Sequence, residues 1–492
     1  MTVSLGAVDI AVLCMALFAA IAIGFWSGRK SVDAESYLLG GRDLPWWAIL
    51  GSIVATETST ATVLSVPGVG FGDTGMKFLQ IAFGYILGRM VVVKVLLPLY
   101  FEGRLFTAYQ VLDQRFGNAT RESASLLFLV TRNLGDGLRL FLAGVVLHTL
   151  LGWSFAACVI VMGVITIVYT WFGGLRSVVW NDCIQFVIYM VGGVASVFLI
   201  THNIPGGWET VQQFATESGK SQIFSFSFEL SDANNIWAGL IGGAVLTIGT
   251  HGTDHMMVQR YLSARSQKDA GRAILLSAFV VLAQFALFLF IGVQLACFYS
   301  TTTAAAPEKA DEVFAHYVVN FFPQNIGLIG LILAAILSAA MSTLSSSLNA
   351  SASACLNDFV VPRCTSEPSE AQQLSWSRWL TLIFGLLQIG IGIGASRLNE
   401  TVVKNALTIA GFAAGLLLGI FLLGVRTKHV RERDALTGAA VGLVTLIVVQ
   451  FDLPLYDVSI AWPWLALIGS ATTYAVGLLS AALFKPAVTN DQ

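Results

Sequence analysis

Long apolar segments separated by short polar connections run along almost the whole chain. A helix that crosses a bilayer needs about 20 predominantly apolar residues, and on that scale the sequence predicts about thirteen membrane-spanning helices. Their starts are expected near residues 5, 44, 76, 123, 153, 178, 236, 273, 326, 376, 400, 435 and 460. The pattern therefore predicts an all-α integral membrane protein.

The composition agrees with this class and argues against others. Of the 492 residues, 56% are hydrophobic and 11% are charged, whereas an ordinary soluble domain carries about 25% charged residues. The net charge of −2 gives no indication of a nucleic-acid partner. Six cysteines without a CxxC spacing do not suggest a disulfide or metal–thiolate framework. Because neither HExxH nor GxSxG occurs, we expect no enzyme and no organic cofactor.

The distribution of basic residues predicts the orientation. Eighteen Lys and Arg residues fall in one set of loops, five in the opposite set, and four within proposed spans. The basic side is expected to be cytoplasmic, which puts the N-terminus outside and the C-terminus inside a cell (inner) membrane. The first apolar run, Leu5 to Trp26, lacks the features of a cleaved signal peptide, so we expect it to remain as a span.

Two spans are interrupted by polar residues. The second reads PWWAILGSIVATETSTATVLSVPGVGFG and carries Glu57 at its polar centre. The seventh reads LIGGAVLTIGTHGTDHMMVQR, where glycines, His251 and Asp254 break the apolar run. Four spans separate the two. Broken helices at equivalent positions in two halves indicate a transporter site, because unwound backbone frees carbonyls that can hold a cation.

A hydroxyl-rich segment, AILSAAMSTLSSSLNASAS, occupies the ninth predicted span. Five of its serines lie on one helical stripe: Ser338, Ser342, Ser345, Ser346 and Ser353. The stripe alone favours close helix packing, and the alternative is a path for a hard cation that prefers oxygen ligands. Elsewhere, Arg132, Asp136 and Arg139 share one helix face, so they neutralise one another or, alternatively, Arg132 binds solute. Asp182 is expected at the same membrane level as the deeper serines of the stripe.

Several segments together resemble the sodium:solute symporter family, which includes sodium/glucose, sodium/proline and bacterial sialic acid transporters. These are YLLGGRDLPWW, AYQVLDQRFG, WFGGLRSVVWNDCIQ, GTDHMMVQRYLSA and AAILSAAMSTLSSSLNAS. The resemblance implies one transporter domain over residues 1–492 with a five-plus-five inverted-repeat (LeuT-type) core. An extra helix at 5–27 would precede repeats at 44–200 and 236–426, and two peripheral helices at 434–484 would follow.

The resemblance also implies ligand sets, in which Na⁺ is the metal. The first sodium site would comprise carbonyls of Ala55, Thr58 and Ala339 with hydroxyls of Ser342 and Thr343. A second would comprise Asp182, Ser342, Ser345 and Ser346. The solute site would comprise Glu57, Ser59, Thr62, Gln80, Arg132, Thr247, Thr250 and His251. In this set Arg132 matches an arginine that pairs with a substrate carboxylate, whereas Glu57 would receive sugar hydroxyls, bind an amine or neutralise Arg132.

The expected function is sodium-coupled symport of a small polar solute into the cell by alternating access. A carboxylate-bearing solute is expected first (a sugar acid or a monocarboxylate), then a neutral sugar, then an amino acid. A channel or a transporter-like sensor is the rival from another class. The expected partners are the solute, Na⁺ and the lipid bilayer, without an obligate protein partner.

Overall fold

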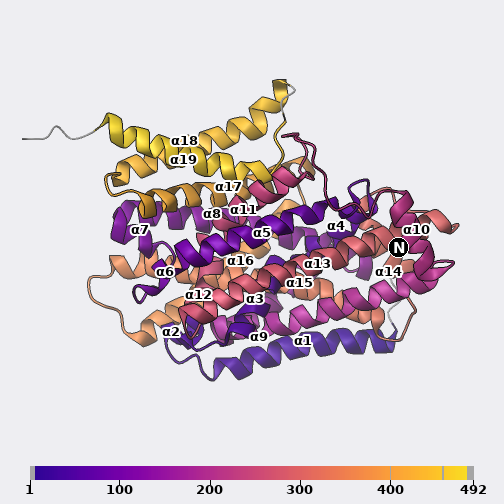
Figure 1. The fold of residues 1–492 in the computed structure, drawn as a ribbon. Coiled ribbons are helices and arrows are strands. Elements are labelled where there is room, and N and C mark those ends of the chain that lie inside the picture. The colour runs from indigo at the N-terminus through magenta and orange to yellow at the C-terminus, as the bar shows by residue number, and fades with distance from the viewer. Residues whose placement is uncertain (1–5, 399, 457–458, 485–492) are drawn as a thin grey trace, which may run out of the picture.

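The chain forms a bundle of long helices in the computed structural model, which describes residues 6–398, 400–456 and 459–484 (Figure 1). Within these ranges the β-type pairing is a single isolated bridge between Leu44 and Ala264, so the all-helical prediction is confirmed for the described residues. Eight of the described helices are long and apolar enough to cross a membrane, and one bent pair adds a ninth. The protein is therefore a multi-pass membrane protein, and the count of about thirteen spans stays a prediction.

The first part of the chain contains a long N-terminal helix, a broken helix and two further long helices. In order these are α1 (Ala7–Gly28), α2 (Ala34–Leu39), α3 (Trp46–Glu57), α4 (Thr60–Phe71), α5 (Gln80–Val91), α6 (Leu97–Phe101), α7 (Gln110–Arg115), α8 (Asn118–Leu151), α9 (Phe155–Asn203) and α10 (Gly207–Glu217).

The second part starts with another broken helix. Its helices are α11 (Gly243–Gly252), α12 (His255–Leu262), α13 (Gln267–Thr301), α14 (Val313–Phe321), α15 (Leu328–Cys355), α16 (Glu370–Ala395), α17 (Glu400–Arg426), α18 (Glu432–Ile447) and α19 (Pro463–Leu483). In Figure 1, α17, α18 and α19 cover one side of the bundle and α1 and α9 the other.

Both interruptions predicted from the sequence are present. Between α3 and α4, Thr58 and Ser59 are extended (ψ 97° and 171°), and the two helices meet at 62°. Between α11 and α12, Asp254 is extended (ψ 121°), and its side chain accepts a hydrogen bond from the Met256 amide at 2.8 Å. Threonine, serine and aspartate favour such breaks because their side chains compete for backbone hydrogen bonds.

The two spans expected near residues 153 and 178 are joined in a single 49-residue helical segment, α9, that turns at Gly174. Gly174 has φ +55°, and a Cβ there would lie 2.3 Å from the Tyr37 carbonyl oxygen. Glycine is needed at this position for both reasons. The α2 segment packs across this turn, where the Tyr37 hydroxyl donates to the Thr170 carbonyl at 3.1 Å.

The hydroxyl-rich helix α15 lies inside the bundle, and nearly all its residues are buried. Asp9 of α1, also fully buried, accepts hydrogen bonds from the amides of Asn325 and Gly327 at 2.9 and 3.0 Å at the start of this helix. A carboxylate there satisfies otherwise unpaired N–H groups and opposes the helix dipole. The cap therefore ties α1 to the start of α15.

Candidate functional site

A cavity of about 300 Å³ lies between the two broken helices and is closed laterally by α5, α8, α13 and α15. This volume is at the lower end of the range for small-molecule sites, about 300–1,000 Å³. Six of the eight predicted solute residues line it: Glu57, Ser59, Arg132, Thr247, Thr250 and His251. Tyr85, Val281 and Phe285 add an aromatic and apolar wall that the sequence analysis did not identify.

Thr62 and Gln80, the other two predicted solute residues, do not line this cavity. Thr62 is in the first turn of α4, where its amide donates to the Ser59 carbonyl at 2.9 Å. The Gln80 amide nitrogen donates to the Asn234 carbonyl at 2.7 Å, and its oxygen accepts from the Ser225 amide at 3.0 Å. Gln80 therefore ties α5 to the segment before α11, and its assignment to the solute site does not fit the geometry.

Glu57 closes the cavity from the end of α3 and is held by two buried partners. Arg89 Nη2 lies 2.6 Å from both carboxylate oxygens, and His251 Nε2 lies 2.6 Å from Oε1. The other ring nitrogen of His251 is 2.8 Å from the Tyr261 hydroxyl. The interpretation that Glu57 neutralises Arg132 is thus wrong, because Arg89 on α5 supplies its counter-charge. The side chain of Glu57 is still 19% exposed and can accept a hydrogen bond from a solute.

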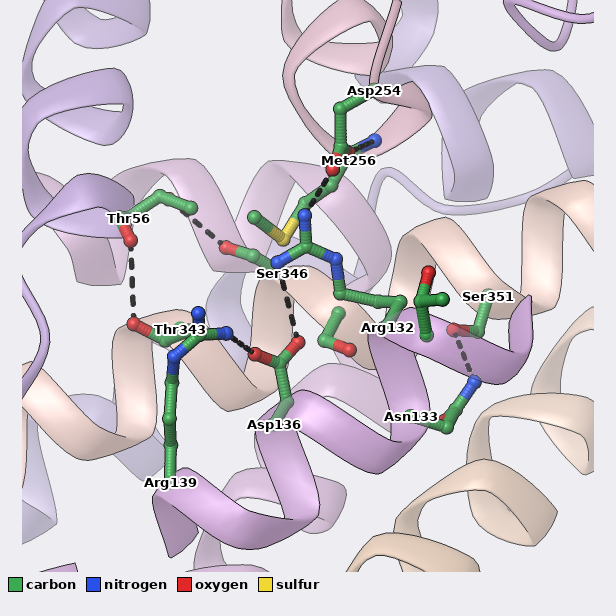
Figure 2. Close-up of polar contacts among 12 residues, drawn as sticks. Thr56, Arg132, Asn133, Asp136, Arg139, Asp254, Met256, Thr343, Ser346 and Ser351 are labelled. Carbon is green, nitrogen blue, oxygen red and sulfur yellow. Dashed lines mark hydrogen bonds and ion pairs between the residues drawn. The ribbon is translucent and has the colours of Figure 1, made fainter. Parts of the chain in front are cut away.

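On the opposite wall, four charged side chains alternate in sign (Figure 2). Arg132 of α8 pairs with Asp254 in the break between α11 and α12. Its Nη1 also lies 3.6 Å from Asp136, one turn further along α8, and Asp136 in turn pairs with Arg139. The α8 triplet therefore shares a face and forms ion pairs, as one of the two open alternatives expected, with Asp254 as an additional member.

Two of the predicted first sodium ligands, Ala339 and Thr343, lie beside the end of α3. The Thr343 hydroxyl lies 3.3 Å from the Thr56 carbonyl and 3.4 Å from the Ala339 carbonyl. Ser59, Ala339 and Thr343 line a further small cavity of about 10 Å³, roughly the space that one water molecule needs.

The other members of this set are buried close by. Ala55 is in the last turn of α3 and fully buried. Thr58, at the break, donates its hydroxyl to the Val54 carbonyl at 2.7 Å and leaves its own carbonyl outside the helical pattern. Ser342 is also fully buried, and its hydroxyl donates a hydrogen bond to the Asp182 carboxylate at 2.5 Å. Carbonyls and hydroxyls are the ligand types that hard cations prefer.

The predicted second set surrounds a buried guanidinium. Asp182 accepts from Ser342 at 2.5 Å on one oxygen, and its other oxygen lies 3.3 Å from Arg260. Arg260 also donates to Ser346. Ser345 is directed elsewhere, since its hydroxyl donates to the Ser342 carbonyl at 3.0 Å. In this arrangement an arginine already neutralises the carboxylate that was expected to hold an ion.

Two of the arginines in the site were missed by sequence reasoning. Arg260 was counted among the basic loop residues and Arg89 was noted only as lying inside a span, yet both side chains have no exposed surface. The available signal was their position: a basic residue at membrane depth requires a carboxylate partner. Glu57 and Asp182 were the carboxylates without a nearby partner in sequence.

Comparisons with known proteins agree with this architecture. A family model described as the sodium:solute symporter family matches residues 37–442. The chain is 26% identical to the sodium/sialic acid symporter NanT of Aliivibrio fischeri over 99% of this chain and 96% of that protein. It is 28% identical to the human sodium-coupled monocarboxylate transporter 1, over 91% of this chain and 74% of that protein.

A solved structure extends the similarity to three dimensions. A sodium-coupled sialic acid symporter in a substrate-bound, outward-open state superposes with a TM-score of 0.89 at 25% identity, over 98% of this chain and 99% of that one. The family model covers far more than half of the sequence, and the fold agrees along nearly its whole length. This chain belongs to the sodium:solute symporter family.

Proposed function

We propose that the protein is a sodium-coupled symporter that takes up a small carboxylate-bearing solute by alternating access. The observation that carries the proposal is the break between α3 and α4, which brings unwound backbone to the buried hydroxyls of α15 directly beside the 300 Å³ cavity. Thr343 lines both this cavity and the small one next to it. An ion held there would touch the wall of the solute site.

The sodium ligands in this proposal are the carbonyls of Ala55, Thr58 and Ala339 with the hydroxyls of Ser342 and Thr343. These are five oxygens without formal charge, which suits a monovalent ion that must leave in every cycle. Because the ion and the solute share a wall, each favours the conformation in which the other binds, and the coupling is reciprocal.

The finer features of the transporter are part of the same proposal. The two helix breaks support a five-plus-five inverted repeat with about thirteen spans. Residues of α2 are buried across one end of the bundle, which supports a conformation closed at that end, and the basic loops support its assignment to the cytoplasmic side of an inner membrane. The outward-open state of the sialic acid symporter supports the same conformation for this chain.

The solute class is supported by three arginines in or behind the cavity walls and by relatives named for sialic acid and monocarboxylates. A neutral sugar is the second candidate, because Glu57 keeps an exposed carboxylate that can accept from hydroxyl groups. An amino acid is the third.

The proposal is tested by measuring thermal stability of the detergent-purified protein against sugars, sugar acids, monocarboxylates and amino acids, in sodium chloride and in choline chloride. A ligand that binds only the folded state raises the melting temperature. We expect a carboxylate to stabilise the protein in sodium but not in choline. We also expect proteoliposomes to accumulate the same compound when the sodium concentration is higher outside than inside. Saturable, sodium-dependent uptake would exclude a channel, and absence of any sodium-dependent solute would contradict the proposal.

A further inference from the structure

The charged groups around the cavity cancel one another. Three are cationic (Arg89, Arg132 and Arg139) and three are anionic (Glu57, Asp136 and Asp254), and each is ion-paired within this group.

His251 adds no charge in its neutral form, in which Nε2 donates to Glu57 and Nδ1 accepts from Tyr261. The nearby Asp182–Arg260 pair is also balanced. A carboxylate that enters this cavity alone would leave a net negative charge in a low-dielectric site, which is strongly unfavourable.

The first sodium set contributes no formal charge of its own. A Na⁺ ion at Thr343 would therefore add one full positive charge at the wall of the cavity, and a monoanionic solute would restore neutrality. The same balance of charges disfavours a neutral solute, because the positive charge of the sodium ion would then have no counter-charge in the cavity.

One arginine has a free side on which such an anion can dock. Arg132 is only 16% exposed, and it is engaged by Asp254 on one nitrogen and Asp136 on another. Arg139 is 44% exposed, has its ion pair to Asp136 through Nη1 alone, and lines both cavities together with Thr343. A guanidinium presents a planar edge that matches a carboxylate.

We propose that the solute is a monoanion whose carboxylate binds the free edge of Arg139, and that bound Na⁺ supplies the positive charge that the balanced cavity lacks. The inference rests on the proposed function and goes further, since it assigns the carboxylate to Arg139 in place of Arg132 and makes charge balance the origin of the sodium requirement.

The test uses pairs of probes that differ by one charge: lactate with lactamide, and sialic acid with its methyl ester. Affinities are measured by titration of the purified full chain in sodium chloride and in choline chloride at equal ionic strength. In the wild type we expect a carboxylate to bind at least about tenfold more tightly in sodium, with a smaller change for its neutral partner.

Glu57→Gln removes one negative charge at nearly constant shape and leaves the cavity with a net positive charge. We expect carboxylate binding in choline to strengthen about tenfold, so that the sodium requirement shrinks. The double variant Glu57→Gln/Arg89→Gln restores neutrality and should restore the sodium requirement. Asp254→Asn likewise removes one negative charge, from the opposite wall. The control is Asp43→Asn, which removes a 55% exposed carboxylate that pairs with Arg176 outside the cavity and should behave as wild type.

Arg139→Gln should abolish carboxylate binding while the neutral partners bind as before. The inference is overturned if Glu57→Gln and Asp254→Asn keep the wild-type sodium requirement, or if Arg139→Gln still binds carboxylates normally. Failure of the proposed function is distinguishable, because the wild type itself would then show no sodium-dependent binding of any probe.

Discussion

Replacing Thr343 by valine tests the first sodium site most directly. Valine has nearly the same shape as threonine but lacks the hydroxyl oxygen, so one of the five proposed ligands is lost without a cavity. The hydroxyl makes only long contacts, 3.3 and 3.4 Å from two carbonyls, so little structural energy depends on it. Ser342 is less suitable, because its hydroxyl binds Asp182 at 2.5 Å and its loss would disturb a buried carboxylate.

The size of the effect follows from the net value of a polar contact to a charged group, about 1.5–3 kcal/mol. At about 1.4 kcal/mol per decade, sodium affinity should fall by roughly tenfold to 150-fold. At a sodium concentration one hundred times the wild-type Kd, binding stabilises the protein by about 2.7 kcal/mol. A thirtyfold weaker site would retain about 0.9 kcal/mol under the same conditions.

The assay is the sodium dependence of the melting temperature and of solute uptake by proteoliposomes. Thr343→Ser keeps the oxygen and should retain most of the affinity. Ser353→Ala removes another hydroxyl of α15, one that lies 3.4 Å from the Phe106 carbonyl and outside both ligand sets, so it should leave sodium affinity unchanged. If Thr343→Val binds sodium within twofold of the wild type, Thr343 is not a ligand and the site is misplaced.

Three further predictions concern stability. Asp182→Asn leaves the buried Arg260 without its counter-charge and should lower the free energy of unfolding by about 3–5 kcal/mol. The melting temperature should fall equally in sodium and in choline. A fall in melting temperature in sodium alone would indicate that Asp182 acts purely as an ion ligand. Asp9→Ala removes the acceptor from the first amides of α15 and should cost about 1–3 kcal/mol, with a smaller loss in Asp9→Asn, and equal melting temperatures for all three proteins would refute the cap. Gly292→Ala places a Cβ 2.0 Å from a backbone oxygen of α4 and should destabilise the protein by about 1–3 kcal/mol. At Gly390 an added Cβ would meet no neighbouring element within 4 Å, so Gly390→Ala should not destabilise the protein in chemical denaturation.

The sequence was sufficient to locate the two helix breaks, because polar and glycine residues inside an apolar run are visible without a structure. It was also sufficient for most of the cavity, since Glu57 and His251 lie in those same breaks. The family resemblance supplied Arg132, whose side chain does reach the cavity. Gln80 does not line the cavity, and the sequence of α5 has no internal marker that fixes which residue faces inward.

The ion pairs between residues on different helices could not be predicted from the sequence. Arg89 is 32 residues from Glu57, and Arg260 is 78 from Asp182, so neither pair follows from the spacing along one helix. The rule for basic loops also treats every arginine near a span end as exposed. Arg260 violates it because every residue of α12 is buried. The position of its guanidinium depends on the packing of α12 against α3 and α15.

The short helix α12 holds two of the ion pairs that define the observed conformation. Asp254, just before its first residue, pairs with Arg132 on α8, and Arg260, near its last, pairs with Asp182 on α9. Movement of α12 away from these helices would break both pairs, and leaving a buried charge unpaired costs about 3–5 kcal/mol. Such a movement requires replacement partners for the exposed charges. Asp136 contacts both Arg132 and Arg139. Under the proposed function, a carboxylate on the free edge of Arg139 would release Asp136 toward Arg132, weaken the Arg132–Asp254 pair and so favour movement of α12.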